Sequence, residues 1–304
     1  MLRDEKKILV RSFHGKEFYN MSTVSIIILA LVVEYFYDDL SKYRKDKIIS
    51  DTFDFLKSKV NLDKYSQSQI CIFFTIFILL LSMVIASVLG YLIPIIYFIV
   101  SLIIILFSLK TNEYNRDIEE FKIKLEFKKN NIDKSLLFKL CPNLKQTRVK
   151  NNMNNLVISN LFFNSIRNTF AIIFYFIILG APGALAYKIM DFMIYSDEFK
   201  MNAKNKQFLK KYMYFIDFIP IRLTAYSFSI VSNYDQVIEK INNLELSSNL
   251  YSSNIEYINQ TGDSVYDNTK KESDQIIQIQ NILSRTLIAW LGVILILSIS
   301  GVFI

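Results

Sequence analysis

Charged side chains beside strongly apolar sequence are the residues of this chain most able to do chemistry. Arg167 and Arg222 each lie next to a long apolar run, and the nearest carboxylates in sequence are Asp191 and Asp217. An unpaired charge inside a membrane costs roughly 2.5–3.5 kcal/mol or more, so each arginine is expected to have a partner. A guanidinium binds carboxylate or phosphate through two parallel hydrogen bonds, so such a cluster could hold an anionic group. A purely structural ion pair is the alternative.

A second candidate is the stretch LGAPGALAYK, which ends a long apolar run. Pro182 removes a backbone donor, and Gly180 and Gly183 permit close approach and unusual dihedral angles. We therefore expect a membrane helix to end here and to turn free backbone groups toward a polar pocket that also receives Arg222 and Arg167. A kink that packs through small residues is the alternative.

The end of this stretch supplies two further polar side chains, Tyr187 and Lys188, which could equally be anchors at the membrane interface. The predicted ligand-binding set is therefore Asn164, Arg167, Gly180, Pro182, Gly183, Tyr187, Lys188, Asp191, Asp217 and Arg222.

Several classes of site find no support in the residue types. The single histidine, His14, and the two cysteines, Cys71 and Cys141, form no cluster with the spacing of a zinc site, and a Ser-His-Asp triad would have to use that one histidine. The chain lacks the G-x-x-x-x-G-K-[ST] pattern of a nucleotide-binding loop. We predict no metal, no cofactor and no catalytic residue.

The composition indicates a membrane protein built from helices. Hydrophobic residues make up 52% of the 304 residues and charged residues 21%, so the apolar residues must gather in blocks. Seven glycines and four prolines are few for a β-barrel, which would also need alternating segments between turns. The net charge of +7 comes from lysines that flank apolar runs. This pattern favours contact with anionic lipid over binding of nucleic acid.

We predict an all-α, polytopic membrane fold with four clear spans and one or two half-polar membrane-associated segments. No charged residue interrupts the sequence from Ile70 to Leu109, which is about twice the length of one span. It is therefore expected to form a helical hairpin that turns at LGYLIP. The predicted spans are 69–88, 91–109, 155–188 and 286–304, and the half-polar segments are 23–37 and 212–231.

The remaining segments are polar. Residues 1–20 are expected to be an N-terminal extension, with Met21 as the natural start, and residues 21–304 a single membrane domain. Three polar loops are predicted, 39–68, 110–154 and 232–285. The first has helical spacing of apolar residues, which indicates an amphipathic surface helix at Ile48, Ile49, Phe53, Leu56 and Val60.

The distribution of lysines raises a conflict about topology. Both flanks of the 69–109 hairpin are lysine-rich and should be cytoplasmic. If residues 169–187 crossed fully, the lysines of 200–211 would fall on the opposite side, which the positive-inside rule disfavours. A broken or partly inserted segment at 180–183 would remove the conflict.

Two stretches carry a resemblance to a known membrane family, the AmpE and CobD/CbiB group. The first runs from Phe170 to Lys188, where the family shows a Phe-rich stretch, a Gly/Pro turn, GAL, and then Tyr and a basic residue. The second, DFIPIRLTA, runs from Asp217 to Ala225 and resembles the family's aromatic-x-Pro-x-Arg-Leu pattern. The resemblance extends loosely over 21–304 and is specific over about forty residues.

The group has two branches, and this chain is more similar to AmpE. The cobalamin enzyme carries a His-Pro-Val motif near its start, whereas here His14 is followed by Gly15. Its paired aspartate is replaced here by Met213 and Tyr214, and Asp217 stands where it has asparagine. The motifs GAPGALAYK and RLTA, in contrast, are closer to the enzyme.

The chain also departs from AmpE, because Asn164 stands where AmpE-type proteins often have glutamate and Ser232 where they have glycine. The resemblance implies an inner-membrane protein of signalling or envelope-modulating function, linked to β-lactamase induction and without catalysis. The partners that we predict are the lipid bilayer, a membrane or envelope protein and an anionic small molecule, with no nucleic acid. The alternative is an ATP-dependent, amide-forming cobinamide-phosphate synthase of cobalamin biosynthesis.

Overall fold

The structure is a computed structural model of the chain. It describes residues 23–37, 40, 42, 44, 46–59, 64–127, 134–141, 153–196 and 198–300. The predicted extension 1–20 and the predicted start at Met21 lie outside these residues. A short helix, Thr23–Phe36, comes first. It is followed by α2 (Lys47–Lys59), α3 (Gln67–Leu92), α4 (Pro94–Ser108), α5 (Thr111–Glu126), α6 (Lys134–Leu140), α7 (Met153–Ser165), η3 (Ile166–Phe170), α8 (Ala171–Tyr195), α9 (Ala203–Val231), α10 (Tyr234–Asn242), α11 (Leu250–Gly262) and α12 (Glu272–Ile299).

The predicted polytopic all-α membrane fold is confirmed. Within the described residues every regular element is a helix, and five helical runs are long and apolar enough to cross a membrane: Gln67–Leu92, Pro94–Glu126, Asn154–Tyr195, Ala203–Val231 and Glu272–Ile299. The helix Thr23–Phe36 is apolar but shorter, in agreement with the length expected for 23–37. The three predicted polar loops contain helices of their own, namely α2, α5, α6, α10, α11 and the start of α12.

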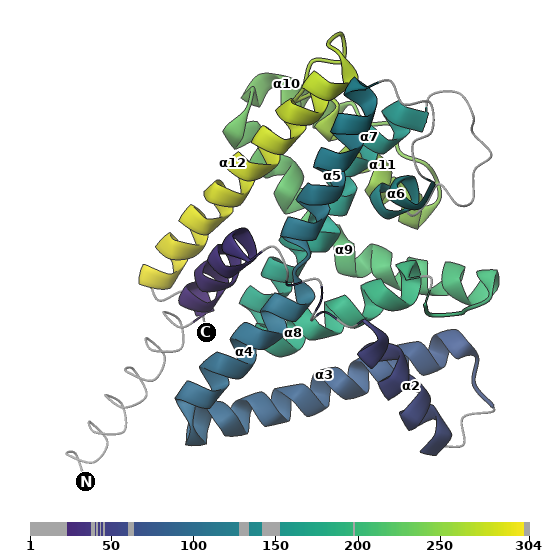
Figure 1. The fold of residues 1–304 in the computed structure, drawn as a ribbon, viewed down its shortest axis with the longest axis vertical. Helices are drawn as coiled ribbons and strands as arrows, with labels where there is room; N and C mark the ends of the chain where they lie inside the picture. The colour runs from purple at the N-terminus through teal and green to yellow at the C-terminus, as the bar shows by residue number, and fades with distance from the viewer. Residues whose placement is uncertain are drawn as a thin grey trace.

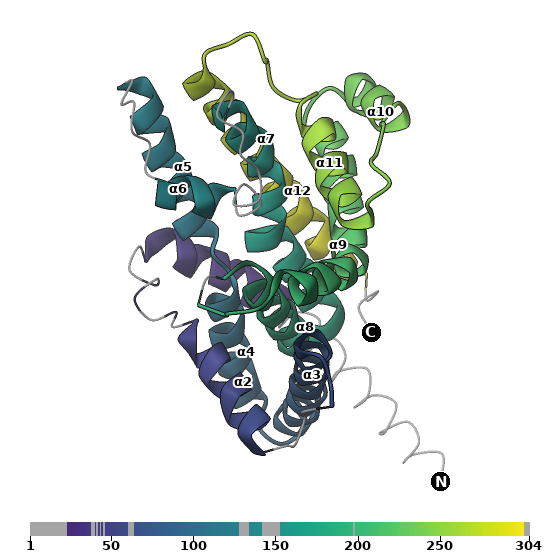
Figure 2. The same cartoon turned by 90° about the vertical axis from the view of Figure 1, so that its right-hand side faces the viewer.

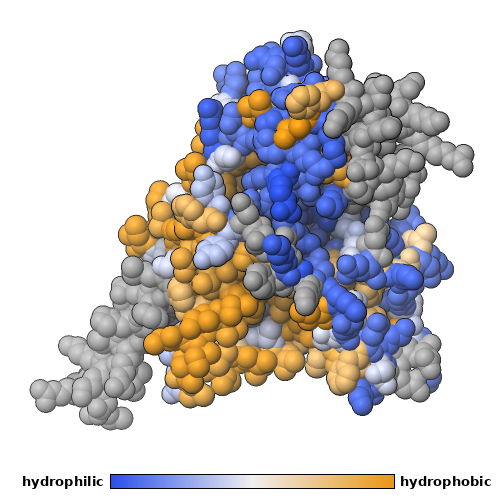
Figure 3. Space-filling model, in the orientation of Figure 1, coloured by the Kyte–Doolittle hydropathy of each residue, from blue (hydrophilic) through white to orange (hydrophobic). Residues whose placement is uncertain are grey.

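The helices divide the molecule into an apolar and a polar part. Helices α3 and α4 carry exposed large apolar side chains, among them Phe73, Phe77, Val84, Ile95 and Ile103. Figure 3 shows this surface as the orange region at the lower left, and a blue hydrophilic surface above it. The upper part contains α5, α7, α10, α11 and the first half of α12, as Figures 1 and 2 show. The apolar part is the surface that contacts the lipid bilayer.

The predicted hairpin over 69–109 is present as α3 and α4. Ser66 begins α3 with a capping box, in which its side chain and that of Gln69 each accept from the other's backbone amide. The two helices are separated at Ile93, whose backbone is not helical, and Pro94 follows at the first position of α4. Proline suits that position because it needs no amide donor there.

The amphipathic helix predicted in 39–68 is α2, although its contact face is narrower than expected. Ile49 and Phe53 are buried, and the ring of Phe53 packs edge-on against Phe74 at 5.3 Å and Phe199 at 5.0 Å. Ile48, which was placed on the same face, is 55% exposed. It lies one residue before Ile49, about 100° around the helix.

Helix α8 folds back on itself at Gly180. This glycine has φ 67° and ψ −159°, a backbone conformation available essentially to glycine alone. The rings of Tyr175 and Tyr187 stack with centroids 5.5 Å apart, whereas twelve residues of straight helix would separate them by about 18 Å. Likewise Arg167 Nε lies 2.6 Å from Asp191 Oδ1. The run therefore forms a hairpin with its tip at Gly180 and its open end at Arg167 and Asp191.

The fold-back of α8 at Gly180 removes the topological conflict. The first arm of the hairpin runs from α7 through η3 to Gly180, and the second arm returns from Gly180 and ends at Tyr195. The chain after α8 then returns to the side from which it entered. In agreement, Gln67 Nε2 donates to the Lys200 carbonyl at 2.9 Å, and Ser68 Oγ bonds with Asn205 at 3.1 Å. The lysines near 200–211 thus lie beside the start of α3.

This arrangement predicts that Lys64 and Lys200 face the same side of the membrane and that Tyr91, at the far end of α3, faces the other. Single cysteines at the three positions should be tested with a membrane-impermeant maleimide on intact cells. Cysteines at 64 and 200 should resist labelling, since the positive-inside rule predicts that the lysine-rich side faces the cytoplasm. A cysteine at the exposed Tyr91 should react. Different labelling at 64 and 200 would contradict the hairpin.

The close approach of the two arms requires Gly183. A Cβ atom added there would lie 2.5 Å from the Tyr175 carbonyl oxygen and 2.6 Å from Leu179 Cβ. We expect Gly183→Ala to lower the free energy of unfolding in detergent by about 1–3 kcal/mol, because a backbone oxygen cannot move aside cheaply. Gly292→Ala is the matched control, since a Cβ at Gly292 meets nothing within 4 Å. Equal stability of the two variants would argue against the tight turn.

Candidate functional site

The site is centred on the junction of α4 and α5, where two helix ends meet. Last-turn carbonyls of α4 and first-turn amides of α5 lack partners within their helices, and the helix dipoles favour a cation at the first and an anion at the second. Arg44 Nε donates to the Leu106 carbonyl at 2.9 Å. Glu34 Oε2 accepts from the Asn112 amide at 3.1 Å. A base and an acid from the N-terminal part of the chain thus cap the two helix ends.

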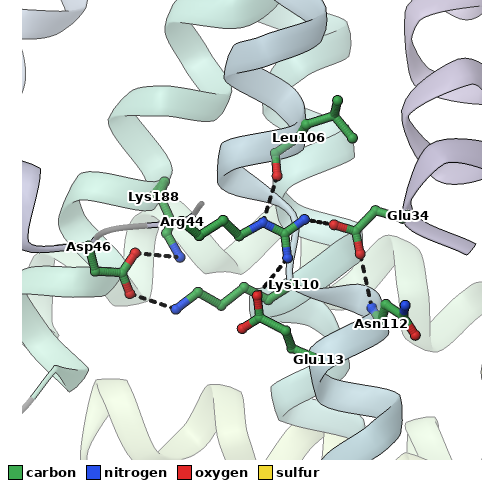
Figure 4. Close-up of polar contacts among 8 residues, drawn as sticks. All are labelled: Glu34, Arg44, Asp46, Leu106, Lys110, Asn112, Glu113 and Lys188. Atoms are coloured by element: carbon green, nitrogen blue, oxygen red, sulfur yellow. Dashed lines mark hydrogen bonds and ion pairs between the residues drawn. The ribbon is translucent and has the colours of Figure 1, made fainter. Parts of the chain in front are cut away.

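Six charged side chains gather at this junction, and we call them the junction cluster. They come from the N-terminal part, from the α4–α5 junction and from α8, and Figure 4 shows them pointing toward one another. Arg44 pairs with Glu34 and lies 2.8 Å from Glu113. Asp46 receives Lys110 at 2.7 Å and Lys188 at 3.8 Å. The members are Glu34, Arg44, Asp46, Lys110, Glu113 and Lys188.

The charges of the junction cluster balance, with three acidic and three basic side chains. Burial alone would raise the pKa of the Asp46 carboxyl. The positive charges of Lys188, Lys110 and Arg44 outweigh that effect and hold its pKa below the usual value. Asp46 is therefore ionised at neutral pH and acts as the counter-ion that the two lysines share.

A second group closes the open end of the α8 hairpin, and we call it the hairpin cluster: Asn164, Arg167 and Asp191. Arg167 Nε donates to Asp191 Oδ1 at 2.6 Å, and its NH1 atom donates to Asn164 Oδ1 at 3.1 Å. The guanidinium also lies over the ring of Tyr195, 3.4 Å from its centroid. Buried arginine is stabilised by this combination of a carboxylate, an amide oxygen and an aromatic face.

A turn of π-helix, η3, links the two clusters. The Asn168 carbonyl of this turn accepts from the Lys110 amide at 3.1 Å. The hydroxyls of Thr111 and Thr169 lie 2.8 Å apart. Single turns of π-helix occur frequently at functional sites. Here the turn, which also carries Arg167, hydrogen-bonds to the α4–α5 junction.

Tyr187 and Asp217 form a third buried contact. The Tyr187 hydroxyl donates to Asp217 Oδ1 at 2.9 Å, and the Tyr175 hydroxyl donates to the Ile216 carbonyl at 2.8 Å. The Oδ2 atom of Asp217 is buried without a hydrogen-bond partner. The two motifs that carry the family resemblance are thus in direct contact.

The structure brings together most of the predicted site residues. Asn164, Arg167 and Asp191 form one cluster, Lys188 joins the junction cluster, and Tyr187 bonds to Asp217. Gly180, Pro182 and Gly183 lie buried at the hairpin tip. In the part of the chain that the structure describes, these three bond to no polar side chain, so the expected polar pocket at the turn is not seen. Their part in ligand binding stays a prediction.

Arg222 lies elsewhere, and its expected contact with the 180–191 segment was wrong. Its guanidinium donates to the Asn254 side chain of α11 and, at 3.5 Å, to the Phe218 carbonyl. It also lies over the rings of Phe218 at 3.7 Å and Tyr257 at 4.5 Å. The described contacts of Arg222 therefore tie α9 to α11 rather than to the α8 hairpin.

Five members of the junction cluster were missed by sequence reasoning: Glu34, Arg44, Asp46, Lys110 and Glu113. Two of them did give a signal. Glu34 is a carboxylate inside an apolar segment, which by itself indicates a partner. Lys110 is the first charged residue after the long apolar run. Asp46 is 64 residues from Lys110, and the Asn112 amide is 78 residues from Glu34, so spacing could not reveal these contacts. The ion pair of Glu34 with Arg44 spans only ten residues, but those ten residues show no helical or strand spacing that would predict it.

No protein-family model, curated protein or solved structure matches this chain. The resemblance to the AmpE and CobD/CbiB group therefore rests on the residues of the two motifs. In the structure these motifs meet through Tyr187 and Asp217.

Proposed function

We propose that this multi-pass membrane protein is an AmpE-like factor of the inner, cytoplasmic membrane, with a signalling or envelope-modulating role related to β-lactamase induction. The observation that carries the proposal is the direct contact between the two AmpE-like motifs through Tyr187 and Asp217. Residues distant in sequence that share a buried polar contact support the idea that the motifs form one functional unit.

The arrangement of charges favours a conformational role over catalysis. Arg167 is paired with Asp191, and the junction cluster pairs three bases with three acids. Buried ion pairs between separate segments can exist in two arrangements, and a ligand that binds one arrangement better shifts the balance. The junction cluster joins the N-terminal part, α4–α5 and α8. A rearrangement there would move the polar part relative to the membrane part.

The proposed partners follow from the same features. The lipid bilayer contacts the apolar surface of α3 and α4. An anionic small molecule would bind the basic side chains of the clusters, and a membrane or envelope protein would receive the signal. The lysines beside the start of α3 support a cytoplasmic orientation for that side.

The test is deletion of the gene in its natural host, followed by measurement of β-lactamase induction by a β-lactam. Deletion should change the induction, and the wild-type gene should restore it. Tyr187→Phe, which removes the bond to Asp217, should restore it only in part. Tyr212→Phe is the matched control, because Tyr212 is 44% exposed on the same helix as Asp217. Unchanged induction together with loss of cobinamide amidation would replace the proposal with the cobalamin enzyme.

A further inference from the structure

Lys110 and Lys188 point their ammonium groups at one carboxylate, that of Asp46. The distances are 2.7 Å from Lys110 Nζ to Oδ2 and 3.8 Å from Lys188 Nζ to Oδ1. Two cations held this close repel each other, so the arrangement needs an anion between them. Asp46 comes from a different part of the chain from either lysine. It occupies the position that a bound anionic group would take.

Asp46 also has a second position available. It directly precedes α2, and its carbonyl accepts from the Ile49 amide at 3.0 Å, which is the placement of an N-cap residue. Aspartate at that position normally turns its carboxylate back to accept from the first amides of its helix. Here Oδ2 accepts from Lys110 instead, and Oδ1 has no hydrogen-bond partner. No acidic residue occupies the first turn of α2 to complement those amides.

We propose that Lys110 and Lys188 form a binding site for a phosphate-type anionic group, which Asp46 fills in the absence of that group. Binding of the anion moves the Asp46 carboxylate from the lysines to the amino end of α2. This inference deepens the anionic-ligand part of the proposed function and rests on it. It adds Lys110 and Asp46, and it names Asp46 as the internal competitor.

Access and charge support this exchange. The Lys188 side chain is only 3% exposed, but those of Asp46 and Lys110 are 20% and 27% exposed. The cluster therefore has some contact with solvent at Asp46 and at Lys110. Departure of Asp46 leaves the cluster with three basic and two acidic side chains, so an anion restores the balance.

The exchange also connects the site to the rest of the molecule. Asp46 directly precedes α2, whose Phe53 packs on Phe74 of α3 and on Phe199 beyond α8. Arg44, two residues earlier, caps α4 through the Leu106 carbonyl. A change in the position of Asp46 thus acts on segments that hold the α4–α5 junction.

The experiment measures binding of inorganic phosphate to the purified full-length protein in neutral detergent at constant ionic strength, by thermal shift and by ³¹P NMR. Asp46→Asn should bind phosphate about tenfold more tightly than the wild type, because the internal competitor has lost its charge. Asparagine caps a helix as well as aspartate does, so α2 should remain intact. Asp51→Asn, an exposed position on α2, removes the same charge and should leave the affinity unchanged.

In the Asp46→Asn background, Lys188→Gln should abolish the gain and Lys188→Arg should keep it. Lys59→Gln, an exposed position, should have no effect. Lys188→Arg keeps the test valid if the glutamine variant does not fold. Equal affinity of Asp46→Asn and Asp51→Asn would overturn the inference, as would a gain that survives Lys188→Gln.

Measurements in nanodiscs distinguish the two possible sources of the phosphate-type group, a lipid headgroup and a soluble phosphate compound. If phosphatidylglycerol in the disc weakens phosphate binding to Asp46→Asn, compared with pure phosphatidylcholine, a lipid headgroup fills the site. If it does not, the ligand is a soluble phosphate compound. Both results support the site. Because binding is measured on purified protein, tight binding with unchanged β-lactamase induction would reject only the signalling role.

Discussion

Replacing Arg167 with methionine should lower the free energy of unfolding by about 3–5 kcal/mol, because it leaves a buried carboxylate without a counter-ion. Arg167 is 6% exposed and Asp191 9% exposed. The variant also loses the hydrogen bond to Asn164 and the stacking on Tyr195. Asp191 is the link between the two arms of the α8 hairpin, so the loss should open the hairpin. Denaturant titration in detergent micelles measures the change.

A variant that lacks both charges distinguishes two effects on the free energy of unfolding. One is the destabilisation by an unpaired buried carboxylate, and the other is the net contribution of the ion pair. The double variant Arg167→Met/Asp191→Leu should recover at least half of the lost stability, since buried ion pairs can often be replaced by apolar residues. Arg222→Met is the matched control, because Arg222 has an amide and aromatic rings around it rather than a carboxylate. It should cost less than Arg167→Met. Equal losses at the two arginines would contradict the role of the Arg167–Asp191 pair.

The Arg167–Asp191 pair and the break at Gly180 were both accessible to sequence reasoning, for physical reasons. A charged side chain in apolar sequence is expected to have a partner of opposite charge, because an unpaired charge is unfavourable there. A Gly-x-Pro-Gly pattern in an apolar run predicts that the helix is kinked or broken at that point. The apolar run of 70–109 could only be a hairpin, given the thickness of a bilayer. These features depend on local composition and on length, which a single sequence contains.

The junction cluster was not accessible in the same way. Arg44 and Glu113 are 69 residues apart, and Asp46 and Lys110 are 64 apart. Their pairing depends on how the N-terminal part crosses the α4–α5 junction, and that is decided by packing. The misplacement of Arg222, in contrast, was avoidable. It follows Asp217 by five residues on one helix, so the two side chains point about 140° apart.

Arg44→Met should be the other strongly destabilising change, at about 3–5 kcal/mol, because Glu34 and Glu113 then face each other without the base between them. The Arg44 side chain is 5% exposed and that of Glu34 is 3% exposed, so water cannot replace the lost partner. The variant also leaves the Leu106 carbonyl at the end of α4 uncapped. The free energy of unfolding in detergent measures the loss.

Two further variants test why Arg44→Met destabilises the protein. Arg44→Met/Glu34→Gln removes one of the two opposing carboxylates and should recover part of the loss. Arg44→Lys keeps the charge but lacks the planar fork that reaches Glu34, Glu113 and Leu106 together, so its stability should lie between those of Arg44→Met and the wild type. Arg116→Met, an exposed arginine on α5, is the matched control and should be close to neutral. If Arg44→Met is as mild as Arg116→Met, the junction of α4 and α5 does not depend on charges from the N-terminal part. The proposed coupling between Asp46, α2 and that junction would then lose its structural basis.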